Sequence, residues 1–321
     1  MPLMTASDAI LEQLAEEQRH VLSPWRGLIL LRRATFSIPP HQRRWEQLPQ
    51  HVEGISPLLR QVRVRQEIRS LPGHSRLYEV IVPYARQGFL DEREVLFEMH
   101  PYAVLSHLSA LVFHGLTTDQ PKGLTMTVSA DTTGGLFPIS TTPRDWEGVI
   151  RPTATIPAKV LGRPVQAKRV KPASFFGFAD YEPHGFTMRY TVPERTLIDG
   201  LSTPGMSGGI NTVLRAWQLG RELIDLDVLV YQVERIGVAI LRQRVGFLLT
   251  ELGLMHPRLE EWRQTAHRGG SSRLVGSEPF APTYDDRWNL SINVPISALH
   301  DSASCATVTL NHLATSPLGR D

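Results

Sequence analysis

The chain has 321 residues, which is enough for about two domains of ordinary size. Hydrophobic residues make up 41% and charged residues 21%, a composition that is typical of globular proteins and excludes a disordered or low-complexity chain. Because 34 Lys and Arg face 32 Asp and Glu, the net charge is only +2, and no overall field draws the protein to nucleic acid or membranes. The single cysteine, Cys305, excludes an internal disulfide and a site of several thiolates.

Targeting signals are not evident in the sequence. No apolar run reaches the roughly 18 residues of a membrane span. Residues 1–8 lack the basic end and the apolar stretch of a secretion signal. We therefore expect a cytoplasmic protein without a membrane partner.

The first elements are helices. Residues 8–20 predict a helix that is capped by Ser7 or Asp8. A second helix is expected to begin at Pro24, because proline at the first helical position gives up only an N–H donor that has no partner there. Its apolar run ends in two arginines, the second of which is Arg33. Cations are favoured near a helix C-terminus, so we expect the helix to end there.

Two more helices and a hairpin follow. We expect a short helix over residues 42–50 and another that begins at Ser56. Residues 65–70 and 76–83 predict a β-hairpin, because turn-forming residues separate them. This is the order of a winged helix-turn-helix, whose last helix enters the DNA major groove while the hairpin contacts the backbone. The sequence thus predicts such a domain over residues 1–92.

Positive charge is concentrated in this part of the chain. Residues 19–86 contain twelve arginines, no lysine and four acidic residues, so they carry 12 − 4 = +8. A basic block in a nearly neutral protein indicates a domain that meets a polyanion, although a solvated basic surface is the alternative. Arg32 and Arg33 are expected to be charges at a helix end rather than base-reading residues. The residues expected to contact double-stranded DNA are Arg43, Arg44, Arg60, Arg63, Arg65, Arg69, His74 and Arg76.

Beyond this domain we expect a mixed α/β domain over residues 93–295, made of short strands and a helix bundle. The fold class is therefore α+β. A helical pattern covers residues 101–116, and strands are expected over 124–129, 158–162, 165–171 and 185–192. Helices are expected over 193–201, 209–220, 225–235 and 236–252, and a strand over 287–294. Residues 296–321 are expected to form a flexible tail.

Three histidines recur at a regular spacing. His100, His107 and His114 lie seven residues apart, near one stripe of the expected helix. Metal ligands on a helix usually lie three or four residues apart, and no Asp, Glu or Cys accompanies these histidines on that stripe. We therefore expect polar positions at the edge of the core and no metal site.

The segment around Glu194 offers a second possible site. Thr191 and Glu194 fit a capping box, which is a sufficient structural role, and Arg195 can pair with Asp199 along the helix surface. Residues 205–209 are glycine-rich but lack the Gly-Lys-Ser/Thr ending of a nucleotide-binding loop. Because the acidic residues lie on separate elements, a metal-dependent nucleic-acid enzyme is the weaker alternative. We predict no catalytic residue and no cofactor.

Three stretches together resemble the AbiEi family of antitoxins. They are SHLSALVFHGL at 106–116, PERTLIDGL at 193–201 and RVGFLLTELG at 244–253, and the late Arg-Trp-Asn at 287–289 also fits. The resemblance covers about residues 95–295. It implies a regulator from a type IV toxin–antitoxin pair, with an N-terminal winged helix-turn-helix that binds promoter repeats and represses its own operon. It also implies that the C-terminal domain counters a nucleotidyltransferase toxin, without a stable complex.

Two other functions remain open at this point. One is a protein-interaction adaptor in a bacterial defence operon, with DNA binding secondary. The other is the metal-dependent nucleic-acid enzyme.

Overall fold

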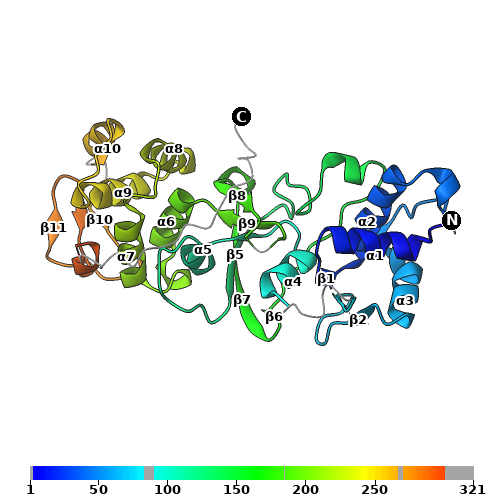
Figure 1. Cartoon of the computed structure of the whole chain (residues 1–321). Coiled ribbons are helices and arrows are strands. Elements are labelled where there is room, and N and C mark those ends of the chain that lie inside the picture. Colours follow the sequence, from blue (N-terminus) through cyan, green and yellow to red (C-terminus); the bar gives the residue numbers. More distant parts are fainter. Residues whose placement is uncertain (1–2, 83–89, 184, 267–269, 301–321) are drawn as a thin grey trace.

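The computed structural model describes residues 3–82, 90–183, 185–266 and 270–300. Figure 1 shows three parts in a row: N-terminal helices with a small sheet, a central six-stranded sheet, and the helices of the C-terminal third. The described ranges contain ten α-helices and three sheets, which confirms a mixed fold of helices and strands. None of the helices in these ranges is both long enough and apolar enough to cross a membrane.

Three helices and a three-stranded antiparallel sheet make up the N-terminal part. In chain order they are α1 (Ala6–Glu16), β1 (Val21–Leu22), α2 (Pro24–Ser37), α3 (Ser56–Val64), β2 (Ile68–Ser70) and β3 (Tyr78–Val80). The strand order is β1-β3-β2, so the expected hairpin is present and β1 adds a third strand to it. Leu14 of α1, Leu30 of α2 and Leu59 of α3 are buried in one hydrophobic cluster.

The ends of the first two helices differ in part from expectation. Thr5 caps α1, since its side chain accepts a hydrogen bond from the Asp8 N–H. Ser23 caps α2 in the same way, with proline following it as predicted. However, α2 continues to Ser37, so Arg33 lies inside the helix. There it pairs with acidic residues of other elements rather than with the carbonyls of a helix end.

The expected helix over residues 42–50 is not formed. A 3-10 turn covers Pro40–Gln42, and residues 43–50 are not helical. The Met4 N–H donates to the Gln42 carbonyl and the Arg44 N–H donates to the Met4 carbonyl, both at 2.9 Å. These extended contacts pair backbone groups that a helix would otherwise have paired.

The central part is built around a sheet with the order β6-β7-β5-β4-β9-β8. Its elements are α4 (Glu92–Met99), β4 (Val104–Leu105), α5 (His107–Phe113), β5 (Leu124–Ser129), β6 (Lys159–Val160), β7 (Arg163–Val170), β8 (Phe178–Tyr181) and β9 (Met188–Thr191). The four strands expected from the sequence are present, and β4 and β8 are additional. The helix expected over 101–116 is shorter, because Val104 and Leu105 pair with β5 and β9 instead.

The two faces of β5 have different chemistry. Met126 belongs to the cluster that also buries Val21, Leu71 and Leu77 of the N-terminal part. Thr125 lies on the opposite face, where its hydroxyl donates to the backbone of the turn before α5. The N-terminal part thus packs on the apolar face of the sheet, and the division into residues 1–92 and 93–295 stays a prediction.

The C-terminal third is a helix bundle with a small sheet. Its elements are α6 (Pro193–Ser202), α7 (Ile210–Gly220), α8 (Leu226–Ile236), α9 (Ala239–Glu251), α10 (Arg258–Ala266), β10 (Ser272–Arg273), β11 (Tyr284–Asp285) and β12 (Leu290–Ser291). The helix α10 was not predicted. Ala298 and Leu299 are buried in the core of the bundle, so the flexible tail does not begin at residue 296 as expected. Residues 301–321 lie outside the described residues.

The helix segment at 244–253 packs directly against Trp288. A Cβ on Gly246 would lie 2.2 Å from the ring of Trp288, so only glycine leaves room for the ring. The Trp288 Nε1–H donates to the Thr250 hydroxyl at 3.1 Å. Gly246 and Trp288 therefore have a structural role in the core.

The start of α6 differs from the predicted capping box. Val192 is the residue before the helix, and it provides no side-chain cap. Glu194 instead accepts a hydrogen bond from the Asp225 N–H at 2.8 Å, which links α6 to the start of α8. Arg195 pairs with Asp199 at 3.0 Å as predicted, but both side chains are buried rather than on the helix surface.

Candidate nucleic-acid interface

Helix α3 carries two arginines on its outer face. Leu59 and Val62 are buried, and this turns Arg60 and Arg63 to solvent. Because they are three residues apart, the two arginines share one side of the helix. Among the described residues neither has an acidic partner, and the only polar contact of Arg63 is with the Ser70 hydroxyl at 3.5 Å. Their positive charge is therefore available to an external anion.

Two further predicted arginines lie next to this helix but have acidic partners. Arg65 donates to Asp8 at 2.7 Å and to Glu67 at 2.8 Å. Hydrogen bonds from Thr5 and Arg65 hold the pKa of Asp8 below its ordinary value. Exposed ion pairs of this kind contribute only about 0–1 kcal/mol, so an external phosphate can compete for these arginines.

Arg69 is paired across the hairpin. Its Nε and Nη2 groups hold the Glu79 carboxylate at 2.7 and 2.9 Å, and the two residues are partners in the register of β2 and β3. Arg63, Arg69 and Ser70 line the same hollow beside α3. The structure therefore brings Arg69 to the surface that also carries Arg63.

Arg43 and Arg44 lie in the extended segment that pairs with Met4. Arg44 is exposed, whereas Arg43 is half-buried. The Arg43 Nη1 group donates to the Thr35 carbonyl at 3.2 Å, and its guanidinium lies 5.6 Å from the centre of the Trp45 ring. The two arginines stay predicted DNA contacts, and only Arg44 is fully accessible.

The hairpin turn is docked on the central part through its two ends and through His74, although Pro72, Gly73, Ser75 and Arg76 are exposed. Leu71 and Leu77, at its two ends, are buried in the cluster of the central sheet. The Leu161 N–H donates to the His74 Nε2 atom at 3.2 Å. Because the turn packs on the central part, His74 has a structural contact there. Arg76 borders a cleft between the two parts.

Four arginines of the basic block point inward. The block therefore does not face DNA as a whole. Arg26, the most buried of them, is fully enclosed, and its Nε group donates to Glu98 at 3.0 Å. Glu98 also accepts from the Ser23 hydroxyl, and Arg26 donates to the Ile139 carbonyl. Burial lowers the pKa of Arg26 below its ordinary value.

The other three inward arginines also reach the central part. Arg33 pairs with Asp145 at 2.9 Å and with Glu17 at 2.6 Å. Arg19 donates to a hydroxyl of the loop before Asp145, and Arg32 donates to a backbone carbonyl just after it. The interpretation of Arg32 and Arg33 as helix-end charges is therefore wrong. Arg86, the last arginine of the block, lies outside the described residues.

The three histidines do not form the stripe that their spacing indicates. His100 follows α4, His107 begins α5 and His114 follows α5, with β4 between the first two. All three are buried. Burial lowers the pKa of His100 and His107 to about 4, so both are neutral at pH 7.

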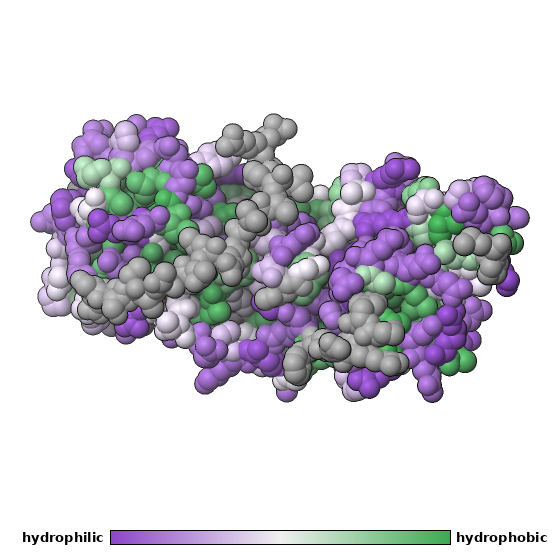
Figure 2. Space-filling model, in the orientation of Figure 1, coloured by the Kyte–Doolittle hydropathy of each residue, from purple (hydrophilic) through white to green (hydrophobic). Residues whose placement is uncertain are grey.

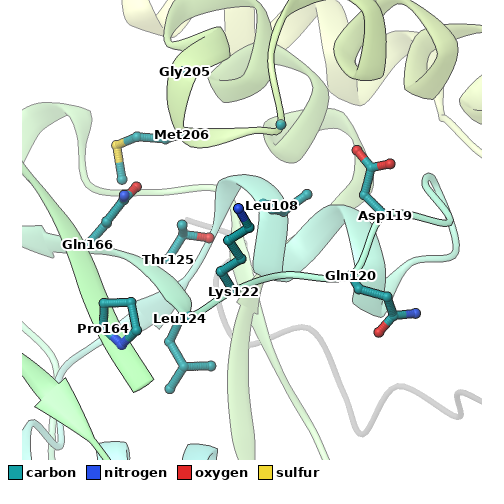
Figure 3. A pocket seen from close by; sticks show the side chains of 12 residues that line it. Leu108, Asp119, Gln120, Lys122, Leu124, Thr125, Pro164, Gln166, Gly205 and Met206 are labelled. Atoms are coloured by element: carbon teal, nitrogen blue, oxygen red, sulfur yellow. The ribbon is translucent and has the colours of Figure 1, made fainter. Parts of the chain in front are cut away.

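The polar face of the sheet borders a cavity of about 470 Å³. Figure 3 shows Lys122, Thr125 and Gln166 around it, below the loop that carries Met206. Asp119 at its edge accepts a hydrogen bond from a threonine of α7. Within the described ranges, no three His, Cys, Asp or Glu side chains gather closely enough to hold a metal ion.

Comparison with known proteins adds information on the fold. No family model matches the chain, and no curated protein matches it either. Among solved structures, the chain is similar to the crystal structure of the RV2827C protein from Mycobacterium tuberculosis, with a TM-score of 0.51 and 15% sequence identity. The alignment covers 92% of this chain and 93% of that one. The two proteins therefore share an overall fold along nearly their whole length.

Proposed function

We propose that the protein is a DNA-binding transcriptional regulator that represses its own operon in the cytoplasm and acts as the antitoxin of a type IV toxin–antitoxin pair. The observation that carries the DNA-binding part is the outer face of α3, where Arg60 and Arg63 are exposed and have no acidic partner among the residues that the structure describes. A guanidinium group on an exposed helix can bind guanine or phosphate through two parallel hydrogen bonds.

The order of elements in the N-terminal part supports this role for α3. Three of the four helices expected there are present as α1, α2 and α3, and the expected hairpin β2–β3 follows them. This order of helices and then a hairpin supports a winged helix-turn-helix. Residues 38–55 join α2 to α3, in place of the three or four residues that are common in this motif. In our proposal α3 enters the major groove, and Arg65 and Arg69 contact the backbone beside it.

The antitoxin part of the proposal rests on the resemblance to the AbiEi family. Residues from the three resembling stretches, among them Leu111, Ile198 and Leu248, pack in one hydrophobic cluster. The three stretches therefore support the idea that the C-terminal region has the fold of that family. They give less direct support for an active site shared with it. A nucleotidyltransferase encoded by the neighbouring gene would support the antitoxin assignment.

A gel mobility shift on the DNA upstream of the protein's own gene tests the DNA-binding part. We expect a retarded band at low salt that competing random DNA does not remove. Unchanged mobility with folded protein would count against the proposal.

A specific observation favours a second candidate, an interaction adaptor. Val228 and Tyr231 lie three residues apart on α8 and are 38% and 59% exposed, and Met255 is 81% exposed. His256 contacts Asp227 at 3.0 Å, which places Met255 near the start of α8. Figure 2 shows hydrophobic residues gathered over α8 and α9 in the same region. Co-purification with the neighbouring gene's product, and its loss in Tyr231→Glu, would support this candidate.

A further inference from the structure

A cleft of about 510 Å³ separates the N-terminal part from the central part. One wall comes from the start of α2, the turn before α3 and the hairpin turn, and the other from the end of α4 and residues 150–155. Small-molecule sites commonly have volumes of about 300–1,000 Å³ and occur preferentially where two domains meet. The size and place of the cleft are therefore those of a ligand site.

Two arginines line this cleft from opposite walls. Arg76 comes from the hairpin turn and Arg151 from the central part, and both are exposed. Neither forms an ion pair with a described residue. The Arg151 Nη1 group donates to the Leu136 carbonyl at 3.1 Å, and its guanidinium lies 5.0 Å from the Phe137 ring centre. Arg151 is thus held by neutral groups of residues 136–137, which lie beside the cleft rather than in its lining, and its charge is not neutralised by these contacts.

The backbone at Arg76 is in the left-handed region, with φ of +64°. A residue other than glycine is uncommon in this region and often indicates a functional constraint. The turn around Arg76 is anchored by the burial of Leu77 and by the contact of His74 with Leu161. The strained turn keeps Arg76 at the edge of the cleft.

The acidic residues of the cleft do not balance these arginines. Of its two carboxylates, Glu98 is already used by Arg26 at 3.0 Å and by the Ser23 hydroxyl at 2.5 Å. Glu53 is the one other carboxylate in the described lining beside Arg76 and Arg151. The cleft therefore has an excess of positive charge and favours an anion.

Apart from His51, the remaining lining is apolar or hydroxyl-bearing. Tyr78 and Ile150 line it, and Ile150 is 70% exposed, so its side chain is accessible to a ligand. The Tyr102 hydroxyl donates to the Pro152 carbonyl at 2.9 Å, which fixes the wall that carries Arg151. An anion with a flat apolar group fits this combination better than a simple inorganic ion does.

We propose that this cleft binds a small phosphate-bearing ligand with a flat ring, which is the chemistry of a nucleoside monophosphate. Arg76 and Arg151 hold the phosphate, and the ring lies against Tyr78 and Ile150. Arg76 then serves this cleft rather than the DNA surface. Ser56, the first residue of α3, also lines the cleft, so a bound anion lowers the affinity of α3 for DNA phosphates. This last consequence rests on the proposed function.

Calorimetric titration of the full chain with adenosine 5′-monophosphate tests the binding site. We expect saturable binding of the monophosphate, weaker binding of inorganic phosphate and no binding of adenosine. The variant Arg76→Ala/Arg151→Ala should bind the monophosphate at least about tenfold more weakly, the loss expected for charge-assisted hydrogen bonds. Arg221→Ala, which removes an exposed arginine far from the cleft in the sequence, is the control and should bind normally. Absence of saturable binding, or equal binding by the double variant, overturns the inference.

DNA binding without nucleotide separates this inference from the proposed function. If wild-type protein binds its upstream DNA but not the monophosphate, the cleft assignment is wrong and the proposed function stands. If it binds the monophosphate but no DNA, the cleft assignment stands and the proposed function is wrong. Arg151→Ala should keep wild-type DNA affinity in the absence of nucleotide. A loss of DNA affinity in this variant would instead place the cleft in the DNA surface and overturn the small-ligand assignment.

Discussion

The arginines of α2 and those of α3 come from the same basic block but have opposite environments. Arg26 is fully buried against Glu98, whereas Arg60 and Arg63 are exposed and have no acidic partner in the described part of the chain. The first set joins the N-terminal part to the central part, and the second set leaves positive charge on an outer helix. A count of positive charges along the chain therefore combines buried, paired arginines with exposed ones, and the contacts of each side chain distinguish the two sets.

The largest expected effect concerns the inward set. Glu98→Ala should lower the free energy of unfolding by about 3–5 kcal/mol, because it leaves the buried Arg26 without its counter-charge. Urea unfolding followed by circular dichroism measures this change. The double variant Arg26→Met/Glu98→Met should recover most of the loss, since it removes both buried charges. A loss below about 1 kcal/mol in Glu98→Ala would mean that the pair is not enclosed.

The next effect is a pH dependence at the same junction. Glu94 is buried and accepts hydrogen bonds from the N–H groups of His20 and Val21. Burial raises the pKa of Glu94 from 4.5 to about 7, although Arg19 and the two hydrogen bonds oppose this and Glu98 adds to it. The folded chain therefore binds this proton more tightly than the unfolded chain. The resulting stabilisation is complete below pH 4.5 and is lost as the pH rises through 7.

The variant Glu94→Gln isolates this contribution, because its side chain stays neutral and its oxygen can still accept both hydrogen bonds. Relative to wild type, its free energy of unfolding should increase between pH 4.5 and pH 8, by at most about 3 kcal/mol. Urea unfolding at a series of pH values measures the difference. His100 and His107, whose pKa values are lowered, act in the opposite direction but cancel in this comparison. A difference that does not change with pH contradicts the assignment.

A smaller effect is expected for the exposed arginines of α3. It concerns the free energy of DNA binding rather than that of unfolding. Arg60→Ala and Arg63→Ala should each weaken specific DNA binding by about 1–3 kcal/mol if the arginine contacts a base. An arginine that contacts only phosphate should instead reduce the slope of log affinity against log salt by about one and leave specificity unchanged. Fluorescence anisotropy with labelled upstream DNA distinguishes the two cases. Stability should change by less than about 0.5 kcal/mol in either variant, because both side chains are exposed.

The smallest effect is expected for the paired arginine of the hairpin. Arg69 is 64% exposed and is neutralised by Glu79 across the strands. Glu79→Gln should strengthen DNA binding slightly at low salt, since it frees the guanidinium for phosphate. Arg69→Ala is the matched variant and should weaken binding by a similar amount. Weaker binding in Glu79→Gln would show that the pair positions Arg69 rather than masking it.

Local patterns in the sequence predict much of the fold. The strands β5 and β7 and the helices α7, α8 and α9 lie where periodicity and turn residues place them. The strand β4 was missed because Val104 and Leu105 continue a helical apolar pattern, and only pairing with β5 and β9 makes them a strand. Non-local pairing of this kind leaves little signal in a short segment.

The direction of a charged side chain is also set by distant residues. Arg26 pairs with Glu98, which is 72 positions away along the chain, and Arg33 pairs with Asp145, which is 112 positions away. The contact of His74 with Leu161 spans 87 positions. No local pattern distinguishes these residues from Arg60, whose exposure follows simply from its place on an amphipathic helix. The outer face of α3 was thus predictable, whereas the inward set and the docked hairpin turn were not.

The most direct test of DNA binding by α3 is fluorescence anisotropy of labelled DNA from upstream of the gene against random DNA of equal length. It is performed with the wild-type protein and with Arg60→Ala/Arg63→Ala. We predict tighter binding of the upstream DNA by wild type, and loss of that preference in the double variant with unchanged stability. Equal affinity of the two folded proteins for the upstream DNA, or no binding by either at low salt, would contradict the account.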